Sequence, residues 1–298
     1  MAAVTTTPGQ LALGDLAAKR TWRSTKSAIL TFLMGFSLVV IMVPLVLVII
    51  TVISKGAGIL SIDFFTKDVP ISARTKGPGM GPAIVGTVLI TGIATLMAVP
   101  LGILAAVYLN EYSAGNRMGR VIRFMATVMT GVPSVVMGLF IYVTYTLRFK
   151  FNAFGGALAL AALMLPIVIR STEEMLKLVP NNLREASLAL GCRRSRTILT
   201  VVLPAALPGV VSGCLLAVAR AAGETAPILF VVDITNKLNL NPFRGGNTAL
   251  SAQIFSNAQS PFVGGQERAW GAALTLLALA FIITLIARLV TARFALKR

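Results

Sequence analysis

The chain has 298 residues with a mean hydropathy of +0.84, and 56% of them are hydrophobic but only 12% charged, a composition typical of an integral membrane protein. The net charge of +17 would also suit a nucleic-acid-binding protein, but the basic residues fall mainly at the ends of apolar segments. Because no basic stripe is interleaved with aromatic residues, we exclude nucleic acid as a partner and expect membrane lipid instead.

Six apolar segments predict an all-α fold with six transmembrane helices. Each is about long enough to cross the roughly 30 Å of hydrocarbon in a bilayer as a helix. They comprise residues 28–53, 83–109, 121–147, 153–169, 205–232 and 269–289. The fourth is the shortest and contains Pro166, and Arg170 after it indicates its end. We expect a polar tail at residues 1–27, an uncleaved first segment, and one transmembrane domain at residues 28–298.

The distribution of lysine and arginine predicts which side of the membrane each loop faces. Seventeen of these 27 residues fall in the tail, after the second and fourth segments, and at the C-terminus. Nine fall in the other loops, and Arg220 lies within the fifth segment. Because cytoplasmic loops carry the excess of positive charge, we expect both termini in the cytoplasm.

The residue types present argue against an enzyme. The sequence contains no histidine, which removes His-dependent nucleophiles and the usual zinc sites, and the two cysteines, Cys192 and Cys214, are too few for a metal site. The phosphate-binding pattern G-x-x-x-x-G-K-[ST] does not occur either. We expect no catalytic residue, metal or cofactor, and any ATP would be bound by partner subunits. An intramembrane enzyme remains a minor alternative.

Two charged residues four positions apart, Arg220 and Glu224, interrupt the apolar fifth segment, and Asp233 follows near its end. A charge at bilayer depth costs roughly 2.5 to 3.5 kcal/mol on insertion scales, so such residues usually face a partner or a watery path. The pair therefore predicts a passage for a polar substrate. The alternative is an ion pair that only holds helices together.

The cytoplasmic loop after the fourth segment predicts a docking helix. Leucine and alanine spacing within residues 181–196 favours a short helix ended by Gly191. Residues 185–204, EASLALGCRRSRTILTVVLP, resemble the E-A-A-x-x-x-G-x(9)-I-x-L-P signature of ABC importer permeases, with Ser187 and Val201 as departures. The resemblance implies a type I ABC importer permease fold. It also implies a coupling helix that contacts an ATPase through Glu185, Ala186 and Gly191.

A narrower resemblance concerns the substrate. Residues 219–228, ARAAGETAPI, are similar to the signature segment of one of the two permease subunits of bacterial phosphate importers. Further similar segments lie at residues 81–87, 132–139, 253–255 and 266–270. The resemblance implies that Arg220 and Glu224 line a path for inorganic phosphate.

Arg170 and Glu173 lie three positions apart at the end of the fourth segment. They can share one helix face near the cytoplasmic mouth. By resemblance they join the polar substrate path. An arginine that only extends to the membrane surface beside a solvated helix end is an equally weighted alternative.

The resemblance also implies a set of partners in a bacterial inner membrane. These are a second permease subunit, two ATPase subunits, and an extracytoplasmic phosphate-binding protein that would meet loops 54–82 and 234–268. Two other functions stay open. One is transport of sulfate or molybdate, and the other is an ion-coupled secondary transporter, which would need no ATPase.

Overall fold

The computed structural model describes residues 22–113 and 115–295. Within these two ranges the chain forms helices and contains no strand, as the all-α prediction requires. The chain divides into two units, Met1–Thr51 and Val52–Arg298.

Helix α1, Trp22–Gly56, supplies the described part of the first unit with its residues 22–51. From Ile29 to Val48 its side chains are exposed on every face and apolar apart from Thr31 and Ser37, and Pro44 lies inside it. A helix that is apolar all round is typical of a membrane span. The predicted span at 28–53 is therefore present and extends at both ends. Of the tail predicted at residues 1–27, residues 1–21 lie outside the described residues.

The second unit contains the remaining helices. Their bounds are α2 Ile62–Thr66, α3 Gly81–Val107, α4 Arg117–Gly131, α5 Ser134–Ile141, α6 Leu147–Phe149, α7 Ala153–Lys177, α8 Asn181–Ala189, α9 Arg194–Thr197, α10 Leu203–Ala222, α11 Ala226–Val231, α12 Leu250–Ala258 and α13 Val263–Ala295. Among the described residues, five helices are long and apolar enough to cross a membrane, and the bent pair α4 and α5 makes a sixth if it counts as one span. This agrees with the expected six spans.

The third predicted span is not straight. The axis turns by 105° between Arg117–Gly131 and Ser134–Phe149. Val132 has an extended backbone (φ −72°, ψ 126°) and precedes Pro133. Proline lacks a backbone N–H and disfavours the helical conformation in the residue before it, so the helix ends there. The single helix expected over 121–147 was therefore wrong in its geometry.

The fourth predicted span is longer than expected. Helix α7 continues past Arg170 to Lys177 and is the most buried of the five long candidate spans. It packs mainly against α3 and α10, and alanines supply much of the contact between α3 and α7. Small side chains let membrane helices approach closely. The helix therefore does not end at Arg170 as expected. Residues 171–177, which were expected in the cytoplasmic loop, are helical.

The fifth predicted span is also divided. Helix α10 ends at Ala222, and a new helix, α11, begins at Ala226. Proline removes a backbone hydrogen bond and its ring crowds the carbonyl four residues earlier, here that of Gly223, so Pro227 favours a break at this point. The single helix expected over 205–232 was therefore wrong in its geometry, and Glu224 lies in the loop between α10 and α11.

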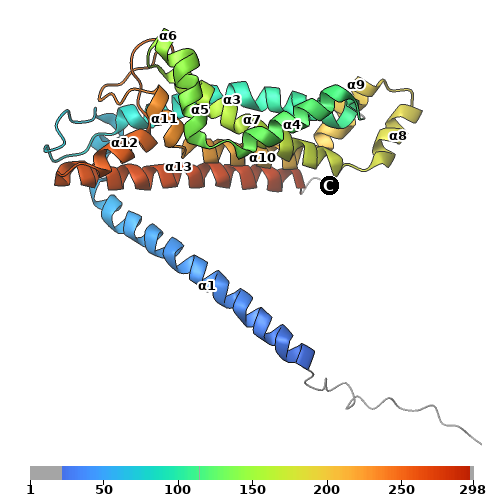
Figure 1. Cartoon of the computed structure of the whole chain (residues 1–298), viewed down its shortest axis with the longest axis horizontal. Coiled ribbons are helices and arrows are strands. Elements are labelled where there is room, and N and C mark those ends of the chain that lie inside the picture. Colours follow the sequence, from blue (N-terminus) through green and yellow to red (C-terminus); the bar gives the residue numbers. More distant parts are fainter. Residues whose placement is uncertain (1–21, 114, 296–298) are drawn as a thin grey trace, which may run out of the picture. The chain divides into compact units, whose positions relative to one another are not determined.

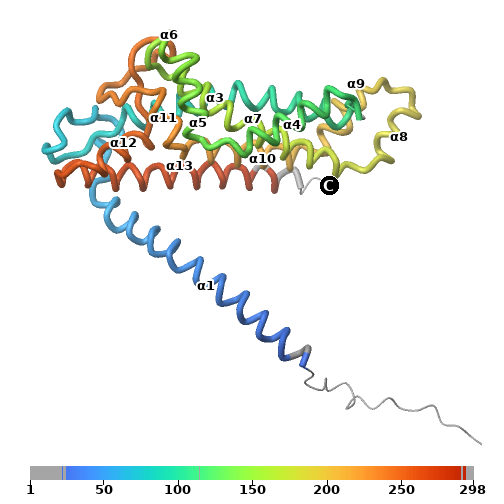
Figure 2. Tube along the Cα trace, viewed as in Figure 1, coloured from blue at the N-terminus to red at the C-terminus, as the bar shows by residue number. Residues whose placement is uncertain are grey.

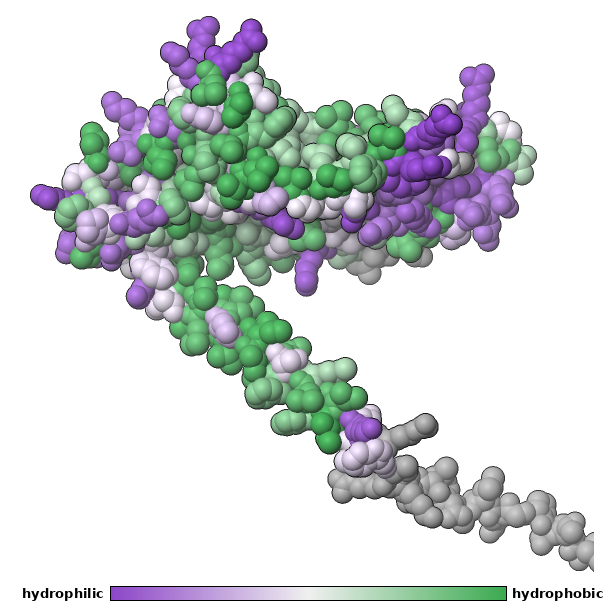
Figure 3. Space-filling view, viewed as in Figure 1, coloured by the Kyte–Doolittle hydropathy of each residue, from purple (hydrophilic) through white to green (hydrophobic). Residues whose placement is uncertain are grey.

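The short helices of the second unit lie at the two ends of its long helices. Helices α8 and α9 lie at one end, and α6, α11 and α12 lie toward the other (Figure 1). The chain passes back and forth between these ends, with α13 running alongside α10 (Figure 2). Hydrophilic residues gather at the two ends, and hydrophobic residues cover the face between them (Figure 3). This pattern suits a protein that crosses a bilayer.

A close backbone contact on α3 predicts a strong effect of a single methyl group. A Cβ atom on Gly86 would overlap the carbonyl oxygen of Thr248, whereas a Cβ on Gly92 of the same helix would meet nothing within 4 Å. We expect Gly86→Ala to destabilise the purified protein by about 1 to 3 kcal/mol, as overpacking does. Gly92→Ala is the matched control and should not lower the thermal midpoint. Equal midpoints for the two variants would contradict the contact.

Candidate functional site

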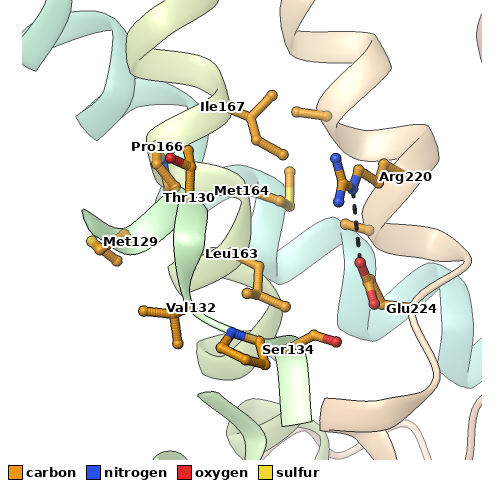
Figure 4. Close-up of a pocket in the computed structure, with 13 residues that line it drawn as sticks. Met129, Thr130, Val132, Ser134, Leu163, Met164, Pro166, Ile167, Arg220 and Glu224 are labelled. Carbon is orange, nitrogen blue, oxygen red and sulfur yellow. Dashed lines mark ion pairs between the residues drawn. The ribbon is translucent and has the colours of Figure 1, made fainter. Parts of the chain in front are cut away.

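A cavity of about 280 Å³ lies where the two interrupted helices meet. Its walls come from the end of α4, the start of α5, the middle of α7 and the end of α10. Arg220 and Glu224 extend into it from the α10 side, facing Leu163 and Met164 of α7 (Figure 4). The break after Gly131 and the break after Ala222 therefore both border this cavity.

Arg220 and Glu224 form a loose ion pair. The Nε atom of Arg220 lies 3.8 Å from Oε1 of Glu224, and the two side chains are 71% and 23% exposed. Ser251 donates a hydrogen bond of 2.9 Å to the backbone carbonyl of Glu224, which fixes the start of the loop. The pair joins α10 to the loop that follows it rather than to another helix. It therefore gives little support to the alternative in which the charges hold helices together.

The rest of the cavity wall has few polar groups. Among the described residues that line it, Arg220 and Glu224 carry the charge, and the hydroxyls of Thr130 and Ser134 add further hydrogen-bonding groups. Methionine, leucine, isoleucine and proline side chains supply most of the remaining surface. One exposed guanidinium beside a carboxylate can attract a small anion without holding it tightly.

Arg170 and Glu173 line a second cavity of about 220 Å³, but they do not pair with each other. Glu173 is buried, and its Oε1 accepts from Nε of Arg123 and Nζ of Lys177, both at 2.9 Å. Arg170 donates through Nη2 to the hydroxyl of Thr127 at 2.8 Å. The sequence drew attention to Glu173 but missed Arg123, which reaches it from α4.

The contacts of Glu173 predict a structural effect. Replacing it with glutamine removes the charge that faces two cations, and both cations are about half exposed, so solvent reduces the loss. We expect Glu173→Gln to lower stability by about 1 to 2 kcal/mol, below the usual value for a fully buried pair. Glu174→Gln, an exposed neighbour, is the control in a thermal unfolding assay. An unchanged midpoint with reduced transport would instead assign Glu173 to substrate.

The helix expected in the cytoplasmic loop is α8, which ends at Ala189. Gly191 follows with φ +80°, a left-handed conformation that glycine adopts without strain. Ser187 faces inward, and its hydroxyl lies 2.9 Å from that of Thr197. This inward contact leaves Glu185 and Ala186 exposed on the outer side of the helix. The three residues carried over by resemblance therefore lie together on one accessible segment.

Sequence reasoning missed the ion pair between Arg184 and Glu111. Their Nη2 and Oε1 atoms lie 3.0 Å apart, and both side chains are largely buried. Glu111 follows the second apolar segment and Arg184 lies next to the docking motif, in regions where charged residues are common. The available signal was only the position of Arg184 beside Glu185.

The family model and the similar proteins all indicate a transport permease. The family described as binding-protein-dependent transport system inner membrane component matches residues 98–296. The chain is 42% identical over 272 residues to a protein of Mycobacterium tuberculosis (strain CDC 1551 / Oshkosh) named phosphate transport system permease protein PstA 1, covering 90% of this chain and 89% of that protein. It is 40% identical to a Haemophilus influenzae protein named phosphate transport system permease protein PstA, covering 85% and 89%.

A solved structure has the same fold. A chain of the bacterial alginate ABC transporter, in complex with an alginate pentasaccharide-bound periplasmic protein, aligns with a TM-score of 0.63. The match covers 92% of this chain and 98% of that chain at 15% identity. At this identity the likeness concerns the fold alone.

Proposed function

The chain belongs to the family of binding-protein-dependent transport system inner membrane components, and we propose that it is a permease subunit of an ATP-driven importer of inorganic phosphate. Two relatives named as phosphate permeases, which cover nearly the whole chain, support this substrate. The observation that carries the proposal is the exposed guanidinium of Arg220. This residue lies in the candidate membrane span Arg194–Ala222 and lines the cavity.

The exposure of Arg220 argues for a passage at this face. A guanidinium exposed to lipid would cost roughly 2.5 to 3.5 kcal/mol, so a second protein surface or water must cover it. A second permease subunit, packed over the open side of the cavity, would supply the other wall. Phosphate would then cross between the two permeases.

The chemistry of Arg220 suits an oxyanion that must be released again. The planar guanidinium offers parallel N–H donors that match two phosphate oxygens, while an ammonium offers only a point charge. Glu224, 3.8 Å away, would partly neutralise Arg220 when the passage is empty. The same carboxylate would weaken phosphate binding, which helps the ion leave.

The second cavity continues the proposed route toward the cytoplasm. Met129 and Thr130 of α4 line the first cavity, and Thr127 lines the second, so the two openings follow the same helix. Arg170 would offer the next guanidinium along this route. Glu173, already paired with two cations, would shape the route rather than bind the anion.

Energy would come from partner subunits. The chain lacks the G-x-x-x-x-G-K-[ST] pattern, so two cytoplasmic ATPase subunits would bind and hydrolyse ATP. Glu185 and Ala186 would contact one of them, and Leu188 and Leu190, which are also exposed, would add apolar contact area. Both termini would lie in the cytoplasm, and a phosphate-binding protein would meet the opposite surface.

Uptake by a reconstituted complex tests the proposal. Vesicles containing this chain, a second permease and ATPase subunits are expected to accumulate labelled phosphate only with ATP and a loaded phosphate-binding protein. Preference for sulfate or molybdate would replace phosphate as the substrate. Uptake driven by an ion gradient without ATPase would instead favour a secondary transporter.

A further inference from the structure

Arg184 of helix α8 binds groups at the ends of two membrane helices, α3 and α7. Its Nε and Nη2 donate to Oε1 of Glu111 at 3.3 and 3.0 Å. Its Nη1 donates to the carbonyl of Val179 at 2.6 Å and to Oδ1 of Asn181 at 3.1 Å, and Nη2 also donates to the carbonyl of Leu176 at 2.9 Å. An arginine has five N–H donors, so each of them has a partner here.

Glu111 accepts two of these hydrogen bonds and is also bound by neighbouring residues. It is 6% exposed and lies in the π-helical turn that directly follows α3. Its Oε1 also accepts from Nδ2 of Asn110 at 2.7 Å, and its backbone carbonyl accepts from Nη2 of Arg194. The guanidinium of Arg194 also lies over the ring of Tyr112, 5.2 Å from its centroid. Two arginines, one before Glu185 and one after Gly191, therefore bind the same turn.

The carbonyls that Arg184 binds belong to the end of α7. Leu176 is in the last turn of that helix and Val179 follows it, so the guanidinium lies at the negative end of the helix dipole. Helix α7 also contributes Leu163 and Met164 to the cavity beside Arg220. One side chain thus connects the docking helix to the ends of α3 and α7, and α7 reaches the cavity.

We propose that Arg184 and Glu111 are positioning residues that transmit movement of α8 to α3 and α7, and so couple ATP hydrolysis to opening of the cavity. The inference rests on the proposed function as an ATP-driven permease. Without the pair, α8 would still be tethered by the contact between Ser187 and Thr197. Glu185 and Ala186 would remain exposed, so the ATPase would bind but its movement would not reach α7.

Two conservative variants test the coupling. Arg184→Lys keeps the charge but cannot make five hydrogen bonds, and Glu111→Gln keeps the shape but loses the charge. In vesicles containing the full complex, we expect both to retain the ATPase and its hydrolysis, while phosphate imported per ATP falls at least about tenfold. Arg193→Lys, an exposed arginine of the same loop, is the control and should keep the wild-type ratio.

Two outcomes would overturn the inference. The first is an unchanged ratio of phosphate to ATP in both variants. The second is failure of both variants to assemble with the ATPase, which would assign the pair to folding alone. If the wild-type complex imports another oxyanion, the proposed substrate fails, but the coupling is judged by the same ratio measured with that ion.

Discussion

Replacing Arg220 with lysine is expected to reduce phosphate uptake about 10- to 100-fold while the complex still assembles. Lysine keeps the positive charge but loses the planar fork that binds two oxygens at once. Hydrogen bonds to charged groups contribute about 1.5 to 3 kcal/mol, and each 1.4 kcal/mol corresponds to about tenfold. Labelled phosphate uptake into vesicles, at equal amounts of assembled complex, measures the effect.

Stability should change little in the same variant. The guanidinium is 71% exposed and lies 3.8 Å from Glu224, so the pair contributes little to folding. Arg288→Lys provides a matched control, because Arg288 is an exposed arginine of α13 that does not line the cavity. Normal uptake by Arg220→Lys would return the pair to the alternative in which it only supports the helices.

The apolar segments predicted the number of spans because a lipid-facing helix is marked by composition alone. Composition did not predict where two of them break. Pro44, Pro100 and Pro166 lie inside continuous helices, whereas Pro133 and Pro227 lie at breaks. Proline is present in both groups, so a proline alone does not determine where a helix breaks. Contacts with residues outside the segment must contribute.

The two breaks stabilise each other through a contact that is distant in sequence. A Cβ atom on Gly138 of α5 would lie 2.6 Å from Cα of Pro227 at the start of α11, so the two segments pack directly together. Helix α5 begins after the first break and α11 begins after the second. Residues at both breaks line the cavity. A sequence taken segment by segment contains no information on this pairing.

The candidate site, like the fold, could be predicted only in part from the sequence. Arg220 and Glu224 are conspicuous because charges are rare within apolar segments. Glu111 and Arg184 lie 73 positions apart, each in a stretch where charged residues are ordinary. Only folding brings them together. The polar site around Arg220 and Glu224 could therefore be predicted from the sequence, but the contact between Glu111 and Arg184 could not.

Reversing the charge at Glu185 is expected to weaken association with the ATPase strongly. Glu185 is exposed on α8, and the inward contact of Ser187 fixes which side of the helix faces outward. Loss of one partner from a charge pair in an interface costs about 2 to 5 kcal/mol, and a lysine would add repulsion. We therefore expect Glu185→Lys to lower the affinity by at least about 30-fold, measured by co-purification and by titration of the ATPase.

Folding and docking can be separated in this experiment. Since Glu185 is exposed on the described surface, its replacement should leave the thermal midpoint of the permease unchanged. Glu174→Lys reverses an exposed charge at the end of α7, outside α8, and should retain the ATPase. If Glu185→Lys binds the ATPase as well as Glu174→Lys does, the contact surface must lie on another part of the cytoplasmic loop, and the assignment of α8 as the docking helix is wrong.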